Sequence, residues 1–441
     1  MYLLTDKQTL ADLDIRNDSS YGGWELCSLF GKTHTKEGKR MVREWISQPL
    51  SDYTLIQERI EAIRSESIPV LDMDEEELDF IEYYLACKVD IVKADWAYSL
   101  ATEVVRKFKH SPQRYVVERG VKLVVRLLDT LRLFADEIKA DAPLLLKRFA
   151  ETIRGSIDST ELKDVLKQSA FPYYTIDSYD YLFRYTRLRT IKEELLSIVY
   201  QLDVLRTAHE VALKRGFSYP CLTRGNTFCA EGFFHPYVKE PVRNNWKLEE
   251  AHICIFTGSN MAGKSTTLKA ISLCVWLAHC GLPVPALRFQ CPVYEGIYTS
   301  INLPDSLRDG RSHFMSEVLR IKEIISGIEL GKHYFVVLDE MFRGTNARDA
   351  YEASVAVNTL LQKYKKSTFL ISTHIVDFAT HFQKDGDCSF YYMESDICED
   401  ELVCSHCLKP GISESRVGYW IVKKELFETI DIKGKECELK K

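Results

Sequence analysis

The sequence has 441 residues, of which 46% are apolar and 28% are charged, a balance that is typical of folded proteins and excludes wholesale disorder. Its formal net charge is −6, so any contact with nucleic acid requires a local basic patch. Thirteen cysteines without a repeating spacing are typical of reduced thiols. No apolar run reaches the roughly 18 residues that a membrane span needs, and we therefore expect a cytoplasmic protein without a membrane partner.

The first 215 residues carry helical periodicity almost throughout. Two apolar stripes with steps of three and four residues predict long helices packed on neighbours. The first stripe comprises Val124, Leu127, Leu131 and Phe134, and the second comprises Ile191, Leu195, Ile198, Leu202 and Leu205. Residues 170–178 are aromatic and turn-prone, and predict a short connection. The sequence thus predicts an all-helical domain over residues 1–215.

From residue 216 onward, short β-rich runs alternate with helical patterns. The predicted strands cover residues 253–256, 334–338 and 368–371, and the helices that follow them cover 265–280, 348–362 and 375–383. Such alternation favours a mostly parallel sheet covered by helices. Residues 216–441 are therefore predicted to form an α/β domain.

Residues 258–265 match the phosphate-binding pattern G-x-x-x-x-G-K-[ST] between a predicted strand and a predicted helix. Glycines let backbone N–H groups approach phosphate oxygens, Lys264 neutralises the β- and γ-phosphates, and the Ser265 hydroxyl coordinates Mg²⁺. The pattern predicts ATP and Mg²⁺ as ligands. The predicted binding residues are Gly258, Ser259, Asn260, Met261, Ala262, Gly263, Lys264, Ser265 and Thr266.

Two carboxylates end the apolar run over residues 335–338. Asp339 is predicted to hold Mg²⁺, and Glu340 to polarise the water that attacks the γ-phosphate. Paired acids can also belong to a solvated loop, but their place downstream of a phosphate-binding loop favours the catalytic interpretation. His374 ends another predicted strand, where it would sense the γ-phosphate or simply be a hydrogen-bonded residue.

Two further clusters allow more than one interpretation. Cys398, Cys404, His406 and Cys407 supply only one metal knuckle, and the alternation from Leu402 to Leu408 favours one face of a β-strand over a zinc site. Residues 101–132 form a basic patch that could bind DNA phosphates, although a solvated helical face is the competing interpretation. Its basic residues are Arg106, Lys107, Lys109, Arg114, Arg119, Lys122, Arg126 and Arg132.

Several of these segments resemble the MutS family of DNA mismatch-repair ATPases. Residues 257–266, with the Asn260-Met261 pair, and the segments around Asp339-Glu340 and His374 are similar to that family's nucleotide site. Residues 310–317 resemble its signature loop. This resemblance implies an ABC-type P-loop ATPase domain and a homodimer in which Ser312 reaches the partner's nucleotide as a catalytic residue.

The resemblance extends to the amino-terminal half, because residues 33–62 are similar to the start of the family's helical core and residues 202–212 to its lever helix. It also implies departures. The mismatch-reading and connector domains are expected to be missing, and residues 168–182 to replace the DNA clamp. Smaller departures from the family pattern are Ser259, His313, Met341-Phe342 and Val242, the last in place of an aromatic residue against adenine.

The combined expectation is an ATP-hydrolysing, DNA-binding protein of the MutS family that acts as a nucleotide-gated dimer. The alternative is an ATP-driven switch whose partner is a ribosome or another protein, which the missing domains would favour. A transporter ATPase subunit fits less well, because residues 1–215 resemble the MutS core.

Overall fold

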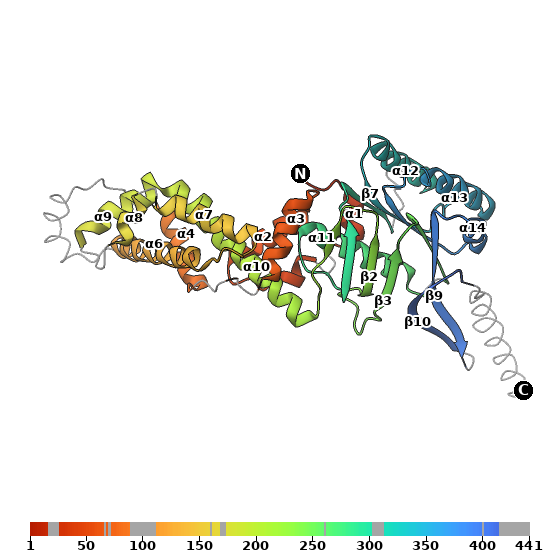
Figure 1. Cartoon of the computed structure of the whole chain (residues 1–441), viewed down its shortest axis with the longest axis horizontal. Helices are drawn as coiled ribbons and strands as arrows, with labels where there is room; N and C mark the ends of the chain where they lie inside the picture. The colour runs from red at the N-terminus through yellow and green to blue at the C-terminus, as the bar shows by residue number, and fades with distance from the viewer. Residues whose placement is uncertain are drawn as a thin grey trace, which may run out of the picture. The chain divides into compact units, whose positions relative to one another are not determined.

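The computed structural model describes residues 1–15, 26–65, 68, 72–88, 112–158, 161–167, 173–259, 262–301, 313–398 and 401–413. The chain forms two compact units, each discontinuous in sequence (Figure 1). The helical unit contains residues 27–45 and 58–211, and the sheet unit contains residues 1–26, 46–57 and 212–441. The predicted division of the chain into domains 1–215 and 216–441 stays a prediction.

Helices dominate residues 26–215. The elements are η1 (Leu26–Phe30), α2 (Lys36–Ser47), α3 (Tyr53–Arg64), α4 (Glu75–Ala86), α6 (Pro112–Glu137), α7 (Leu144–Asp158), α8 (Leu162–Leu166), α9 (Tyr173–Tyr181), the π-helical turns η2 (Leu182–Thr186) and η3 (Thr190–Leu195), and α10 (Leu196–Arg215). All residues of the two predicted apolar stripes are buried. None of the described helices is both long and apolar enough to cross a membrane.

The close approach of α4 and α6 requires a glycine. A Cβ atom on Gly120 of α6 would lie 2.1 Å from Cγ of Tyr84, whose buried ring belongs to α4. The Tyr84 hydroxyl donates a hydrogen bond of 2.7 Å to Asp180 of α9, which also accepts from Arg184. This polar cluster joins three helices inside the helical unit, and its buried donors and acceptors are paired.

The prediction of a connection over residues 170–178 is wrong for its described part, because α9 begins at Tyr173. Ile176, Tyr179 and Phe183 are buried at helical spacing. Asp177 of α9 pairs with Arg114 of α6. Long-range contacts of this kind override the weak helix propensity of an aromatic, turn-prone segment.

The sheet unit contains helices α1 (Lys7–Asp12), α11 (Lys264–Cys280), α12 (His313–Glu329), α13 (Ala347–Leu361) and α14 (Val376–His381). Its strands are β1 (Cys221–Thr223), β2 (Phe228–Phe233), β3 (Asn244–Leu248), β4 (Ile253–Thr257), β5 (Arg288–Pro292), β6 (Gly296–Ser300), β7 (Tyr334–Asp339), β8 (Thr368–Thr373), β9 (Cys388–Cys398) and β10 (Glu401–Pro410). They form a six-stranded sheet, β10-β9-β4-β8-β7-β6, and a four-stranded sheet, β1-β5-β2-β3.

The six-stranded sheet confirms the predicted mostly parallel arrangement, since among its described strands only the β9–β10 pair is antiparallel. The four-stranded sheet is mixed and was not predicted. Helix α11 packs against strands of both sheets, and its residues from Ala270 to Cys280 are all buried, which explains why this part of its sequence is largely apolar on every face. Its Trp276 and His279 hydrogen-bond to the backbone oxygens of Ile46 and Leu50, at 2.9 and 2.7 Å.

The strand register brings the ends of three strands together. Thr257 of β4 pairs with Thr373 of β8, and Ser372 of β8 pairs with Asp339 of β7. In parallel strands the carboxyl ends lie at one edge of the sheet, where ligands of open α/β folds bind. The three predicted sequence motifs therefore meet at one edge.

Candidate nucleotide-binding site

The loop after β4 adopts a backbone that requires glycine. Gly258 and Gly263 have φ of 143° and 104°, which is unfavourable for residues with a Cβ atom. A Cβ atom on Gly263 would also lie 3.2 Å from Nδ1 of His406. Helix α11 begins directly after this glycine, so its free N–H groups face the loop. Asn260 and Met261 lie outside the described residues.

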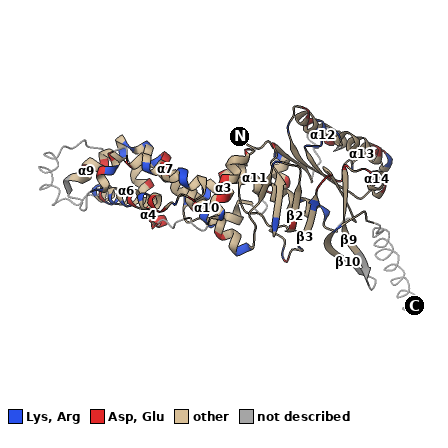
Figure 2. Cartoon of the chain, in the orientation of Figure 1, with Lys and Arg blue, Asp and Glu red and all other residues tan. Residues whose placement is uncertain are grey.

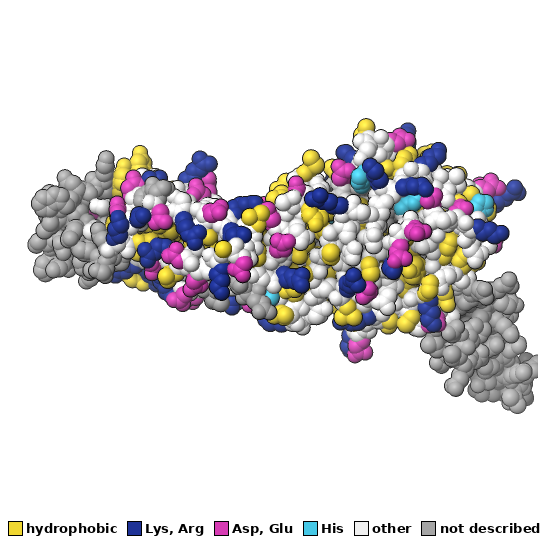
Figure 3. Space-filling model, viewed as in Figure 1, with side chains coloured by type: hydrophobic (Ala, Val, Ile, Leu, Met, Phe, Trp, Pro, Cys, Tyr) yellow, Lys and Arg dark blue, Asp and Glu magenta, His cyan; other side chains and the backbone are white. Residues whose placement is uncertain are grey.

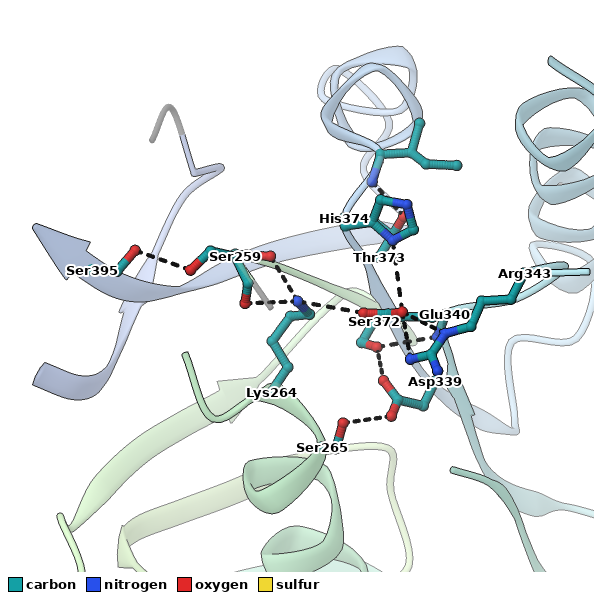
Figure 4. Close-up of polar contacts among 12 residues, drawn as sticks. Ser259, Lys264, Ser265, Asp339, Glu340, Arg343, Ser372, Thr373, His374 and Ser395 are labelled. Carbon is teal, nitrogen blue, oxygen red and sulfur yellow. Dashed lines mark hydrogen bonds and ion pairs between the residues drawn. The ribbon is translucent and has the colours of Figure 1, made fainter. Parts of the chain in front are cut away.

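Lys264 is the first residue of α11 and is buried. Its Nζ donates hydrogen bonds to the backbone oxygens of Gly258 and Ser259, at 2.7 and 3.0 Å (Figure 4). The same Nζ lies 3.6 Å from Oε1 of Glu340. Burial lowers the pKa of Lys264, and the nearby carboxylates oppose this effect. The Lys264 amine is thus held against the backbone of the glycine loop.

Ser265 and Asp339 bring two hard oxygen atoms together. The Ser265 hydroxyl donates a hydrogen bond of 2.6 Å to Oδ2 of Asp339, and the Ser372 hydroxyl donates to Oδ1 (Figure 4). Burial raises the pKa of Asp339, while the hydrogen bonds from the two serines lower it. Hydroxyl and carboxylate oxygens are ligands that Mg²⁺ prefers, so this pair fits a magnesium ion.

Glu340 is buried among three basic side chains. Its Oε2 accepts a 2.6 Å hydrogen bond from Nε of Arg343 and lies 3.7 Å from Nδ1 of His374, which is exposed (Figure 4). Hydrogen bonding to His374, together with the charges of Lys264 and Arg343, lowers the pKa of Glu340 to about 2 against the effect of burial. The carboxylate is therefore ionised at neutral pH, which makes it a strong hydrogen-bond acceptor for water.

The turn that carries Glu340 has an unusual backbone. Glu340 and Phe342 have φ of 48° and 64°, in the left-handed region that bulky residues rarely adopt. Each costs on the order of 1–3 kcal/mol, so surrounding contacts must hold the turn. One such contact is the hydrogen bond of 3.1 Å from the Glu340 N–H to the Ser372 backbone oxygen.

A pocket of about 360 Å³ adjoins the glycine loop, with Thr266, Val242 and His406 among its lining residues. His406 has φ of 53° and hydrogen-bonds through Nδ1 to the Ala262 oxygen at 3.1 Å. Strand β10 confirms the strand predicted over Leu402–Leu408. A bulge between Cys404 and Leu408 shifts its register and interrupts the regular alternation. The alternation gave no signal for this contact with the loop.

Two family models match the chain. The model described as MutS domain III matches residues 8–212, and that described as MutS domain V matches residues 254–430. The chain belongs to the MutS family. The predicted family resemblance is therefore confirmed.

Curated relatives carry the name "DNA mismatch repair protein MutS". That of Aquifex pyrophilus is 28% identical over 252 residues, which are 55% of this chain and 29% of the relative. That of Staphylococcus haemolyticus is 27% identical over 246 residues, 54% of this chain and 28% of the relative. That of Natronomonas pharaonis is 29% identical over 252 residues, 53% of this chain and 29% of the relative. The matched part of this MutS-family chain thus covers less than a third of the length of these relatives.

Ser312, the residue predicted to act across a MutS dimer, lies outside the described residues. Helix α12 begins at the next position, His313. In the part of the chain that the structure describes, no group of three or more histidine, cysteine and acidic side chains is arranged to hold a metal ion.

The basic patch predicted as a MutS–DNA contact is only partly described, since Arg106, Lys107 and Lys109 lie outside the described residues. Of its remaining arginines, Arg114, Arg126 and Arg132 of α6 form ion pairs with acidic side chains. Figure 2 shows basic and acidic residues interspersed along this helix and its neighbours, and Figure 3 shows side chains of both charges on this part of the surface. The described portion of the patch therefore carries charges of both signs.

Proposed function

We propose that this MutS-family chain binds ATP with Mg²⁺ and hydrolyses it at the edge of the six-stranded sheet. The observation that carries the proposal is the convergence of two pairs: Lys264 Nζ lies 3.6 Å from Glu340 Oε1, and Ser265 Oγ lies 2.6 Å from Asp339 Oδ2. These residues come from two sequence motifs about 75 residues apart, so their meeting in space supports a single site.

The loop and Lys264 would bind the phosphates. Backbone N–H groups of the glycine loop and of the first turn of α11 donate to phosphate oxygens, and Lys264 supplies a compact positive charge. Ser265 and Asp339 would hold Mg²⁺, which stabilises negative charge on the β- and γ-phosphate oxygens. The pocket beside Val242 and His406 would receive the adenine base.

Glu340 would orient the attacking water. With a pKa of about 2, its carboxylate accepts a hydrogen bond from water and aligns it with the γ-phosphate, instead of donating a proton. His374 lies beside this carboxylate and is exposed, so its imidazole can reach a bound γ-phosphate. Ser312 of a second copy would complete the charge stabilisation across a homodimer.

The wider role is proposed by homology. We assign residues 216–441 to an ABC-type ATPase domain and residues 1–215 to a helical core and lever domain. The relatives' name supports DNA as the partner, with the basic patch at residues 101–132 as its contact. If the chain binds DNA through its phosphates, the logarithm of the binding constant should fall linearly with the logarithm of the salt concentration. Titrations against duplex and branched DNA at several salt concentrations measure this slope.

The ATPase proposal is tested with two variants and two controls. Lys264→Ala should abolish ATP binding, because Lys264 neutralises phosphate charge in the ground state. Glu340→Gln should keep ATP binding and slow hydrolysis at least about a hundredfold, because Glu340 acts on the water. The controls are exposed positions of the sheet unit, Lys322→Ala and Glu352→Gln.

Equilibrium binding of labelled ATP and the rate of phosphate release separate the two effects. A Glu340→Gln variant that hydrolyses ATP at the wild-type rate would contradict the role of Glu340. A Lys264→Ala variant that binds ATP normally would contradict the assignment of the phosphate site.

A further inference from the structure

Helix α12 holds the turn that carries Glu340. The backbone N–H of Phe342 donates a hydrogen bond of 2.7 Å to Oε2 of Glu317. Glu317 lies on α12 and is only 6% exposed, and Phe342 is 2% exposed. A buried carboxylate that accepts from a backbone N–H makes a strong, directional contact. This contact lies two residues from the carboxylate proposed to orient water.

The turn needs such a contact because of its backbone. Glu340 and Phe342 are both left-handed, and neither is a glycine. A residue with a side chain leaves this conformation unless its surroundings over-determine it. The centroid of the Phe342 ring lies 5.3 Å from the centroid of the Phe314 ring. Phe314 lies one turn before Glu317 on α12. Two residues of α12 thus hold the ring and the amide of a single residue.

Helix α12 is itself held firmly on the same stretch. Arg320, one turn after Glu317, lies 2.6 Å from Oδ2 of Asp6 and also donates to the backbone oxygen of Thr299 near the end of β6. The helix is therefore tied to the neighbouring strand on one side of Glu317 and to the Glu340 turn through Glu317 itself. It can act as a rigid support for that turn.

We propose that Glu317 is a positioning residue for ATP hydrolysis: its carboxylate captures the Phe342 amide and so maintains the left-handed turn that places Glu340 beside Lys264. This inference rests on the proposed ATPase function. If the capture is lost, the turn relaxes and the Glu340 carboxylate moves relative to the γ-phosphate. The glycine loop and Lys264 are untouched, so ATP binding persists while hydrolysis slows.

Two substitutions of Glu317 distinguish the effect of side-chain length from the effect of charge. Glu317→Asp keeps the charge but shortens the side chain, so the carboxylate no longer reaches the Phe342 amide. Glu317→Gln loses the charge but keeps an acceptor oxygen at the same distance. We expect kcat to fall at least about tenfold in the aspartate variant and to stay within about threefold in the glutamine variant. The dissociation constant for ATP should change less than about twofold in both. Glu323→Asp, at an exposed position of the same helix, is the matched control.

Hydrogen exchange gives a readout that does not depend on activity. The Phe342 amide should exchange slowly in the wild type and in Glu317→Gln, and markedly faster in Glu317→Asp, without a general loss of protection. Wild-type kcat and slow exchange in Glu317→Asp would overturn the inference. So would the reverse order, a glutamine variant that is inactive beside an active aspartate variant. A wild-type chain that binds ATP without hydrolysing it would instead refute the proposed function, and the exchange experiment would still test the Glu317 contact.

Discussion

Two helical glycines of the helical unit predict opposite effects of the same substitution. Gly120 of α6 faces the Tyr84 ring, and an alanine Cβ atom would lie 2.1, 2.4 and 2.7 Å from three of its carbon atoms. At Gly155 of α7, an added Cβ atom would meet nothing within 4 Å, and the residue is exposed. Both positions lie within helices, so alanine gains about 1 kcal/mol of helix propensity at each.

At Gly120 the steric cost exceeds that gain. Tyr84 is fully buried and its hydroxyl is hydrogen-bonded to Asp180, so the ring cannot move aside without breaking this bond. Inserting a methyl group into such a core typically costs about 1–3 kcal/mol, and a 2.1 Å approach belongs at or above the upper end. Gly120→Ala should therefore lower the free energy of unfolding by about 2 kcal/mol or more. Gly155→Ala should raise it by about 0.5–1 kcal/mol.

Urea unfolding followed by the helical circular dichroism signal measures both changes under identical conditions. The comparison between the two variants removes the contribution of helix propensity, because the chemical change is the same. A Gly120→Ala variant as stable as Gly155→Ala would refute the close packing of α4 against α6.

The remaining predictions concern the candidate site. The pKa of Glu340 falls from its usual 4.5 to about 2 on folding, so ionisation of this carboxylate stabilises the folded state above pH 4.5. This contribution to the free energy of unfolding is lost as the pH falls toward 2. Glu340→Gln should accordingly lower the free energy of unfolding by up to about 3 kcal/mol at pH 7 and by much less at pH 3; an equal loss at both pH values would contradict the ionised, buried carboxylate. If catalysis is shared across a dimer, an equal mixture of Lys264→Ala and Ser312→Ala chains should recover about a quarter of wild-type ATPase activity, because half of the dimers hold one intact site. Absence of recovery at any mixing ratio, with a monomeric protein in ATP, would contradict the shared site.

The fold could be predicted where the apolar pattern is long and regular. The stripe ending at Phe134 lies on the buried face of α6, and the stripe ending at Leu205 lies on the buried faces of η3 and α10, as the spacing of three and four residues requires. The helix α9 was missed because its buried residues are mixed with aromatic and turn-forming ones, and its partners lie some 60 to 100 residues away in sequence. The four-stranded sheet was missed because its strands are short and pair out of order, as Cys221 with Gln290.

Some residues of the candidate site could likewise be predicted from a local sequence pattern, whereas others could not. The glycine loop and the Asp339-Glu340 pair are contiguous motifs, and their chemistry can be predicted from residue types and spacing alone. Ser372 acts on Asp339 only because β8 lies between β4 and β7, an order that no local pattern contains. His406 and Glu317 reach the site through a bulge and through a left-handed turn, and neither feature has a periodic signal.

The residues of the contiguous motifs and the residues that are distant in sequence also have different roles in the proposed mechanism. The contiguous motifs supply the groups that would touch phosphate, magnesium and water, whereas the distant residues set where those groups stand. Glu340 illustrates the dependence: Lys264, Arg343 and His374 contact its carboxylate, Ser372 holds its amide, and Glu317 holds the amide two residues on. These contacts come from α11, the β7 turn, the end of β8 and α12. A catalytic carboxylate placed by so many elements responds to movement of any one of them, so we expect hydrolysis to be more sensitive than ATP binding to substitutions outside the glycine loop.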